Sequence, residues 1–404
     1  MRALEEGVLL YPVYALLFAD TGLTTAEISS LFAIWSVVSF ACEIPAGALA
    51  DVWSRKRLYA LGQAVTAAGF ACWLIWPSYA GFALGFVLWG VGGALGSGTL
   101  EALVYDELGE STAYARLIGR SGTVALLAML AATLLAAPAY RAGGYLLVGI
   151  ASIATVTLGG LLALRLPEKP RFGTGDAAPN PKPDRPQTAR WDDASASGQA
   201  PQAGPGDPAE AGGEQDAVHD GYLAMLRAGV REATGSGRVA RALLIAAAVP
   251  GFSALDEYLP LLARDKGSPT SGVPLLFALT ALAMAAGSAL AGRLPPTTPR
   301  PLAGALALAA ALLAVGSLVP HLAGMLAVSA AFGLLQFAMV HAETRLQETI
   351  TGPARTTVLS ISGFAAEVCA VALYGAFALP VSLPLLFAAA LVPLLATALL
   401  AARR

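Results

Sequence analysis

Residues 43–57 of the chain have the sequence Glu-Ile-Pro-Ala-Gly-Ala-Leu-Ala-Asp-Val-Trp-Ser-Arg-Lys-Arg. An apolar run rich in small residues meets one acid, Asp51, and then three consecutive cations. This order is typical of a helix that leaves a bilayer on its cytoplasmic side, where cations lie beside anionic lipid. Small residues in such a helix also let a neighbouring helix approach closely. The stretch therefore predicts a membrane protein.

The composition of the whole chain agrees with this prediction. Of the 404 residues, 56% are hydrophobic and only 13% are charged, and the mean hydropathy is +0.65. Soluble domains carry roughly 25% charged residues. The apolar residues fall into blocks of about 20, the length that crosses a hydrocarbon core of roughly 30 Å. We expect an all-α membrane protein with twelve transmembrane helices, at 5–23, 26–50, 57–76, 80–104, 114–138, 143–165, 240–263, 272–292, 301–319, 322–342, 355–379 and 382–402.

The distribution of cations predicts the orientation of these spans. If both termini are cytoplasmic, then of the 25 lysines and arginines only Arg141, Arg264 and Lys266 fall in outer loops. The opposite orientation would invert a strong positive-inside bias. We therefore expect cytoplasmic N- and C-termini.

A compositionally different segment divides the chain into two groups of six spans. Residues from 166 to about 220 are dense in Pro, Gly, Ala, Ser and Asp and have few large apolar residues. Such a segment cannot bury enough surface to offset its ordering entropy, so we expect it to be disordered. The predicted organisation is a six-helix bundle at 1–165, a cytoplasmic linker at 166–236 and a second six-helix bundle at 237–404.

Four arginines follow the disordered part of this linker at helical spacing, which suits two interpretations. One is an amphipathic helix on the inner membrane surface, and the other is a positive flank ahead of the seventh span. The arginines are Arg227, Arg231, Arg238 and Arg241.

The two predicted bundles also share short sequence features. Ala48-Leu49-Ala50 recurs as Ala289-Leu290-Ala291, and Ser121-Gly122 recurs as Ser362-Gly363, both at an offset of about 241 residues. A nearly constant offset favours a parallel tandem repeat, which is the architecture of many secondary transporters.

At the end of the second predicted span the sequence resembles a known family, the major facilitator superfamily. The signature of that family between spans two and three is roughly G-x-x-x-D-R/K-x-G-R-R/K. The chain has four of its residues in register, namely Gly47, Asp51, Arg55 and Lys56. It departs from the pattern at Val52 and Ser54, where the family has a basic residue and a second glycine.

The resemblance implies a cytoplasmic gating motif made of these residues and an acid at the inner end of span four. In the family the motif's Asp contacts nearby cations and the start of a helix of the other half, and it stabilises the outward-open state. An arginine forms strong bidentate pairs with carboxylates, and the candidate acids are Glu101, Asp106 and Glu107, of which we assign Asp106. The alternative is that the cations after Asp51 only determine topology.

Two further family signatures are absent. The span-four arginine expected before Gly90-Val91-Gly92 is replaced by Phe86, and span five lacks the G-P-x-x-G-G run associated with proton-linked drug antiporters. This absence counts against antiport. By contrast, the stretches 100–106 and 256–261 resemble patterns in bacterial efflux-type members.

Acidic residues inside predicted spans are the candidates for proton coupling or substrate binding, because ionisable groups in hydrocarbon are costly. At about 1.5 Å per residue, Glu367 lies about 18 Å deep, near the midplane, and Glu43 about 12 Å deep. The candidates, in decreasing order, are Glu367, Asp256, Glu257, Glu43 and Asp20. For each, the alternative is a hydrogen-bonded carboxyl that only fixes helix packing.

Aromatic residues in the spans are candidates to line a central cavity, although aromatics in spans more often pack or face lipid. These candidates are Tyr11, Tyr14, Trp35, Phe252, Tyr258 and Tyr374.

The sequence therefore predicts a secondary active transporter that moves a small organic molecule across a bacterial-type cytoplasmic membrane by alternating access. The first interpretation is proton-coupled efflux of a drug or metabolite. The alternatives are an uptake permease or facilitator and a transport-inactive receptor or scaffold. A membrane enzyme would need a catalytic constellation, and the three isolated histidines provide none. We expect no cofactor, no metal and no nucleic acid; the expected partners are a substrate, the bilayer and protons, and the functional unit is a monomer.

Overall fold

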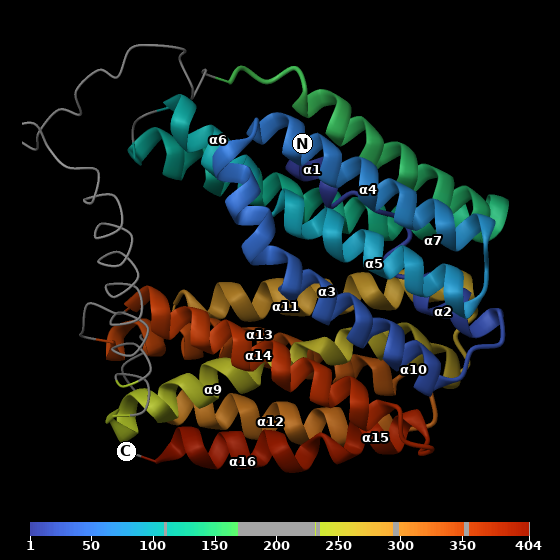
Figure 1. The fold of residues 1–404 in the computed structure, drawn as a ribbon. Coiled ribbons are helices and arrows are strands. Elements are labelled where there is room, and N and C mark those ends of the chain that lie inside the picture. Colours follow the sequence, from blue (N-terminus) through green and yellow to red (C-terminus); the bar gives the residue numbers. More distant parts are fainter. Residues whose placement is uncertain (109–110, 169–230, 232–234, 294–298, 351–354, 404) are drawn as a thin grey trace, which may run out of the picture.

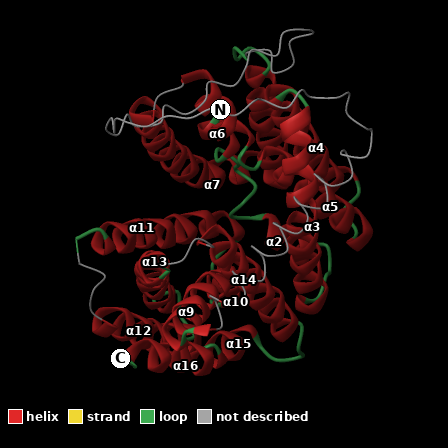
Figure 2. Cartoon of the chain, turned by 60° about the vertical axis from the view of Figure 1, so that its left-hand side comes forward, coloured by secondary structure: helices red, strands yellow, loops and turns green. Residues whose placement is uncertain are grey.

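The structure, a computed structural model, describes residues 1–108, 111–168, 231, 235–293, 299–350 and 355–403. In these ranges the regular elements are helices (Figure 2). The predicted disorder of the linker and the positions of Arg227 and most of its neighbours lie outside the described residues. The first group of helices is α1 (Arg2–Glu5), α2 (Tyr14–Asp20), α3 (Thr25–Val52), α4 (Arg55–Ile75), α5 (Tyr79–Gly96), α6 (Thr99–Leu108) and α7 (Ser111–Ala163).

The second group follows the linker and contains both α-helices and short 3₁₀ segments (Figure 1). Its elements are α9 (Gly237–Ser253), η1 (Ala254–Tyr258), α10 (Leu259–Asp265), η2 (Thr270–Gly272), α11 (Val273–Ala291), α12 (Pro299–Leu318), α13 (Gly324–Thr349), α14 (Arg355–Phe377), α15 (Leu383–Ala389) and α16 (Leu391–Ala402).

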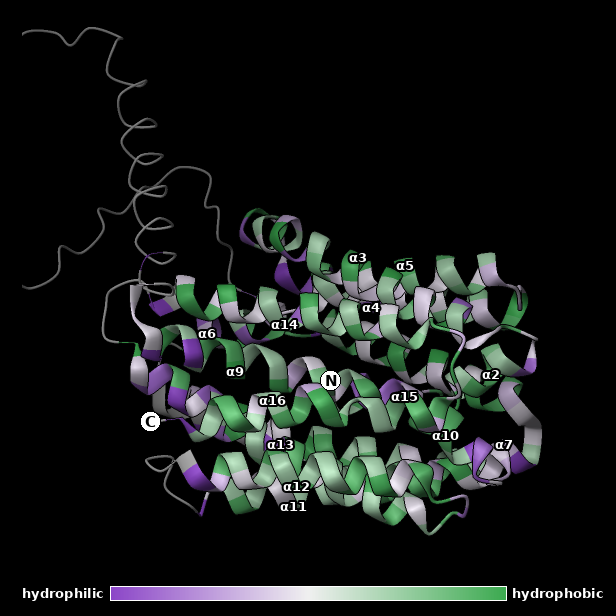
Figure 3. Ribbon diagram, turned by 90° about the horizontal axis from the view of Figure 1, so that it is seen from below, coloured by the Kyte–Doolittle hydropathy of each residue, from purple (hydrophilic) through white to green (hydrophobic). Residues whose placement is uncertain are grey.

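The prediction of an all-helical membrane protein is confirmed. Ten helical segments of the described chain are long and apolar enough to cross a membrane. Figure 3 shows hydrophobic residues along the lengths of the helices and hydrophilic residues gathered toward their ends. The number of candidate spans, ten, differs from the expected twelve for two reasons. Helix α7 covers two expected spans but is counted once, and the helices before Gly22 are too short to be counted.

Helix α7 is two helices joined by a pair of glycines. Gly143 and Gly144 are non-helical, with Gly144 at φ 60°, ψ −153°, a region that only glycine adopts readily. The chain turns back there (Figure 1), so that residues 111–142 and 145–163 run in opposite directions. This break falls at the first two residues of the predicted span 143–165, directly after the gap that the sequence predicts at 139–142.

The predicted first span, 5–23, is wrong as a continuous helix. Between α1 and α2 the chain makes turns around Pro12, which has no N–H to donate. The backbone N–H of Leu10 instead donates to Ser152 Oγ of α7 at 3.0 Å. A backbone N–H without a partner in lipid costs several kcal/mol. The contact with Ser152 gives the Leu10 N–H a partner, and it therefore makes the break in the helix possible.

Two other predicted spans are also interrupted. Span 80–104 divides into α5 and α6 at Ser97 and Gly98, where Gly98 has φ 65°. Span 240–263 divides into α9, η1 and α10 a few residues after Pro250. The interruption of the seventh span places Asp256 and Glu257 in a 3₁₀ segment, and it therefore shapes the site described below.

Helices pack mainly within their own group, and the two groups meet along a limited seam. Across this seam, α3 packs against α14, α7 against α11, and α2 against α10. In Figure 1 the first group lies above the second. Both termini lie at one end of the assembly, here called the termini end. The far end carries the α2–α3, α4–α5 and α10–α11 connections.

Within the second group, α11 and α13 approach each other closely at two glycines. A Cβ on Gly287 would overlap the carbonyl oxygen of Gly333. We predict that Gly287→Ala lowers the melting temperature of the purified protein, because small residues allow this approach. Gly304→Ala on α12 is the matched control: a Cβ there meets open space, and alanine favours helix over glycine by about 1 kcal/mol. Equal melting temperatures for the two variants would contradict this account of the packing.

Candidate functional site

A cavity of about 720 Å³ lies between α3, α5 and α14, at the seam between the two groups. It is lined by Trp35, Ser39, Phe40, Glu43, Ile44, Gly47, Trp89, Gly93, Ala94, Ser97, Ser360, Gly363, Phe364 and Glu367. Its residues nearest the termini end are exposed, among them Gly47, Ser97 and Ser360. The cavity therefore extends from the middle of the molecule toward the termini end.

A second cavity of about 300 Å³ adjoins the first on the side of the second group. The two cavities share Trp35, Gly363 and Glu367. The second is lined in addition by Pro250, Ser253, Ala254, Asp256, Glu257, Ala366, Ala370 and Tyr374. Four of the five acidic candidates thus border one continuous space, and Asp256, Glu257 and Glu367 border its inner part together.

Glu367 makes a hydrogen bond across the seam. Ser36 Oγ of α3 donates to Glu367 Oε2 of α14, and one turn nearer the termini end Phe40 packs against Phe364 with ring centroids 5.2 Å apart. The Glu367 side chain is half-buried and faces the cavity that it lines. A carboxyl in this position links the two groups and is open to water from one end.

Glu257 also makes a hydrogen bond across the seam, nearer the far end. The Tyr14 hydroxyl donates to Glu257 Oε2. The next residue, Tyr258, has its hydroxyl 2.8 Å from Ser29 Oγ of α3. Because these residues occupy the 3₁₀ segment η1, adjacent side chains point in directions that a continuous α-helix would not give them. Two neighbours can therefore both reach the first group.

The far end of the seam is closed by an ion pair. Arg264 Nη1 lies 2.5 Å from Asp20 Oδ1, and the Tyr145 hydroxyl donates to Asp20 Oδ2 at 2.5 Å. Nearby, Lys266 Nζ donates to the carbonyl oxygens of Ser317 and Val319 at 2.8 and 2.5 Å, which ties the segment after Arg264 to the end of α12. Burial lowers the pKa of the Lys266 ammonium. The structure thus places Asp20 in a far-end contact, apart from the cavity that holds the other acids.

At the termini end, the predicted partner of Arg55 is found. Arg55 Nη1 lies 2.8 Å from Asp106 Oδ2 of α6, while Glu101 pairs with Arg2. Lys56 Nζ donates to the Leu166 carbonyl at 3.2 Å. Asp51 is exposed at the end of α3.

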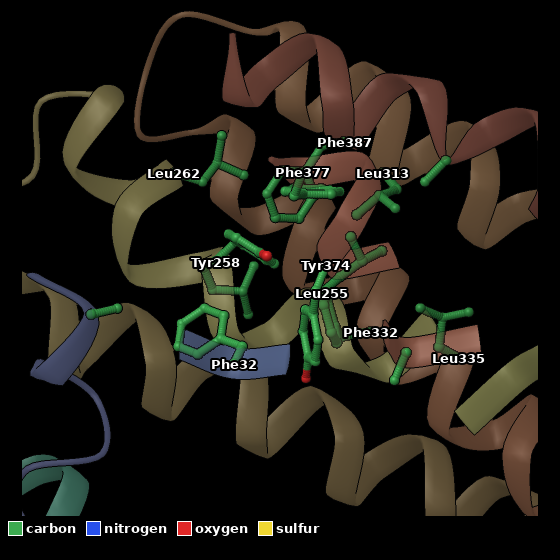
Figure 4. Close-up of a cluster of buried hydrophobic side chains, with 14 of the residues drawn as sticks. Phe32, Leu255, Tyr258, Leu262, Leu313, Phe332, Leu335, Tyr374, Phe377 and Phe387 are labelled. Carbon is green, nitrogen blue, oxygen red and sulfur yellow. The ribbon is translucent and has the colours of Figure 1, made fainter. Parts of the chain in front are cut away.

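The aromatic candidates divide into lining and packing residues. Trp35 and Tyr374 line the cavities. Tyr11 stacks on Trp89 with ring centroids 5.5 Å apart. Tyr258 is fully buried with Phe32 and Phe377 in the cluster shown in Figure 4. Phe252 packs against the same core.

Several residues of the site were missed by sequence reasoning. Across the seam, Ser29 accepts a hydrogen bond from Tyr258 and Ser36 donates one to Glu367. The two serines are seven residues apart on α3, a spacing that places them on one helix face. Glu168 accepts from Ser54 Oγ and, at 2.6 Å, from the Arg55 N–H, which caps α4. Of these residues, only the two serines had a signal in the sequence that could have identified them, namely their spacing.

In the described part of the chain, no group of three or more His, Cys, Asp or Glu side chains is placed to hold a metal ion. The chemistry that the arrangement offers is proton exchange and polar or cationic recognition by carboxyl groups beside aromatic rings.

Comparison with known proteins gives one family. The family model described as Major Facilitator Superfamily matches residues 6–372. A search of curated protein sequences found no significant match.

Solved structures with the same fold are transporters of low sequence identity. The nucleoside transporter NupG matches with a TM-score of 0.67 and 11% identity, over 99% of this chain and 96% of that one. A D-xylose–proton symporter matches with a TM-score of 0.65 and 15% identity, over 93% and 87%. A bacterial homologue of the human lysosomal transporter Spinster, in an inward-facing and unoccupied conformation, matches with a TM-score of 0.63 and 16% identity, over 92% and 78%.

We predict that Asp20→Asn opens the far end by a small amount. A partly exposed ion pair contributes about 0–1 kcal/mol, which changes the ratio of closed to open molecules by about fivefold at most. Spin labels at exposed Pro77 and Leu379, one in each group, report the far-end distance in a variant without Cys42, Cys72 and Cys369.

The matched control is the charge exchange Asp20→Arg with Arg264→Asp, which should restore the short distance. An unchanged distance distribution in Asp20→Asn, or a double exchange that opens the far end further, would show that the pair does not close the seam.

Proposed function

The chain belongs to the Major Facilitator Superfamily, and we propose that it moves a small organic molecule across a bacterial-type cytoplasmic membrane by alternating access of its two helix groups, coupled to protons. Family membership makes it a multi-pass membrane transporter and not an enzyme. The observation that carries the rest of the proposal is that Asp256, Glu257 and Glu367 border one cavity at the seam between the groups.

The topology we propose has twelve crossings with both termini in the cytoplasm. The turn at Gly143 and Gly144 divides α7 into two crossings, and residues 8–23 with α2 supply the first. Residues 1–165 and 237–404 form the two bundles, and 166–236 connect them. The support for this orientation is that Arg264 and Lys266 lie at the far end while most cations lie at the termini end.

With this orientation, the conformation described above is inward-facing. The far end is closed by the Asp20–Arg264 pair and by the Tyr258–Ser29 contact, whereas the large cavity reaches exposed residues at the termini end. A substrate bound between Trp35 and the inner carboxyls would exchange with the cytoplasm. The outward-facing state requires the opposite: the far-end contacts open and α3 and α14 close around the cavity.

The proposed coupling residues are Glu367, Asp256, Glu257 and Glu43. A carboxyl changes its proton affinity when its surroundings change from water to apolar protein or when a hydrogen-bond partner leaves. Glu367 and Glu257 both accept hydrogen bonds from the other group, from Ser36 and Tyr14. Movement of the groups would make or break these bonds, which ties protonation to conformation.

The gating motif has a proposed role at the opposite step of the cycle. Arg55 and Asp106 are paired within the first group, while Asp51 is exposed beside the cavity end at Gly47. When the termini end closes, Asp51 is positioned to approach the N-terminus of α14, whose partial positive charge favours a carboxylate. The pair between Arg55 and Asp106 keeps α4 and α6 fixed for that contact.

We propose export as the direction, with a drug or metabolite as substrate and a monomer as the functional unit. The support is the likeness of residues 100–106 and 256–261 to efflux-type members. The carboxyls and the rings of Trp35, Trp89 and Tyr374 suit a substrate with an apolar body and a hydrogen-bonding or cationic group.

We predict that Glu367→Gln abolishes proton-driven flux and preserves substrate binding, because glutamine keeps the size and a hydrogen-bond acceptor for Ser36 but cannot exchange a proton. Proteoliposomes with a trapped pH dye and a panel of nucleosides, pentoses, dipeptides and cationic dyes report substrate-dependent proton movement, and equilibrium binding of the active compound reports recognition.

Glu343→Gln on α13 is the matched control, since Glu343 does not line either cavity and should retain flux. Wild-type flux in Glu367→Gln would reduce Glu367 to a packing residue. If none of the panel moved protons through the wild-type protein, proton coupling for these substrate classes would be refuted.

A further inference from the structure

A third cavity, separate from the transport site, lies inside the second group at the termini end. It measures about 90 Å³ and is enclosed by α9, α12, α13 and α16. Three arginines line it: Arg238 and Arg241 from the start of α9, and Arg345 from the last turns of α13. The remaining lining is mostly apolar, with Ala342 and Ala401 among it. A concentration of cations against an apolar wall is unusual and calls for an anion.

One of these cations is incompletely satisfied in the described part of the chain. Arg345 Nη1 is buried and has no hydrogen-bond partner. A buried donor without a partner is destabilising, more so when it carries charge. Glu343 and Glu348 flank Arg345 on α13, and neither of them lines the cavity. Among the described residues, the lining of this small cavity therefore carries three guanidinium groups and no carboxylate.

The start of α9 adds to this positive charge. The N-cap residue Ser236 makes no side-chain cap hydrogen bond, and the first turn of α9 carries the positive end of the helix dipole. Arginines at a helix N-terminus oppose that dipole, and an anion bound between them would remove the conflict. Arg238 and Arg241, at helical spacing on α9, line the cavity with Arg345.

The chemistry of the three side chains specifies the kind of anion. Guanidinium groups bind phosphate through two parallel N–H···O bonds. A cavity of about 90 Å³ is several times the roughly 10–15 Å³ that admits one water, so a tetrahedral phosphate group fits. The position of the cavity at the end of membrane-spanning helices is the depth of lipid headgroups, and the same helices expose Leu244 and Leu399 within a turn of it.

We propose that this cavity binds the phosphate group of an anionic phospholipid in the leaflet at the termini end. The bound headgroup would hold the ends of α9, α13 and α16 together. Helix α9 leads directly into η1, which carries Asp256 and Glu257. The lipid would therefore support the helix on which the transport carboxyls are mounted, although its binding does not depend on what the protein transports.

The test measures lipid retention and thermal stability of the purified full-length protein. Phosphatidylglycerol, phosphatidylcholine and inorganic phosphate are added separately to detergent micelles, and bound lipid is counted by native mass spectrometry. We expect phosphatidylglycerol to be retained and to raise the melting temperature, with little effect of the other two. The double variant Arg238→Gln/Arg345→Gln should lower the apparent affinity for phosphatidylglycerol by about 30-fold.

Two controls separate this site from general attraction of anions. Arg116→Gln/Arg120→Gln removes two exposed arginines from the first group at the same end and should leave retention unchanged. Ala401→Met fills the cavity but keeps all three arginines, and it should also abolish retention, so the test does not depend on the folding of the arginine variant.

Retention equal to wild type in either cavity variant would overturn the proposal. So would equal retention of phosphatidylcholine, which carries no net charge. Stabilisation by inorganic phosphate that matches that by phosphatidylglycerol, and is lost in the cavity variants, would overturn the lipid as the source and assign the cavity to free phosphate.

Discussion

The structure depends on one constraint: inside a bilayer, polar groups must find partners within the protein. Helices satisfy nearly all backbone groups, and where a helix is interrupted a side chain takes over, as when the Leu10 N–H donates to Ser152. The same constraint applies to carboxyls. Glu257 and Glu367 occur where the seam between two helix groups provides both a hydroxyl partner and water. The carboxyls proposed to couple transport therefore lie at the seam, which is also where the proposed movement of the two groups would act on them.

Among the described residues, the polar contacts across the seam differ along the axis of the molecule, and they lie beside apolar ring contacts such as Phe32 with Tyr258. At the far end an ion pair, Asp20–Arg264, and the Tyr258–Ser29 contact join the groups. In the middle Ser36 meets Glu367. Toward the termini end the cavity takes their place. Exchangeable polar bonds of modest net strength at the seam suit two arrangements of similar free energy, which the proposed alternating access requires.

Sequence patterns predicted what depends on composition and local order. The apolar blocks placed α3, α4, α11, α12 and α14 to within a few residues, because hydrophobic length is set by the bilayer. The pairing of Arg55 with Asp106 followed from a family motif. The breaks in the first, fourth and seventh spans were missed because they rely on tertiary contacts, such as that of Leu10 with Ser152. The pairings of Ser36 with Glu367 and of Tyr14 with Glu257 were missed for the same reason: each joins residues more than 240 positions apart.

The central claim is that one set of carboxyls meets water from one side of the membrane at a time. It is tested most directly by the labelling of a single cysteine at Ala366, which lines the inner cavity, in a variant without the native cysteines. A membrane-impermeant thiol reagent is applied from either face of oriented membrane vesicles. The account predicts labelling from the termini face in the resting protein, and a shift toward the far face when Asp20 and Tyr14 are replaced by Asn and Phe. Equal and simultaneous labelling from both faces, or labelling that the replacements leave unchanged, would contradict it.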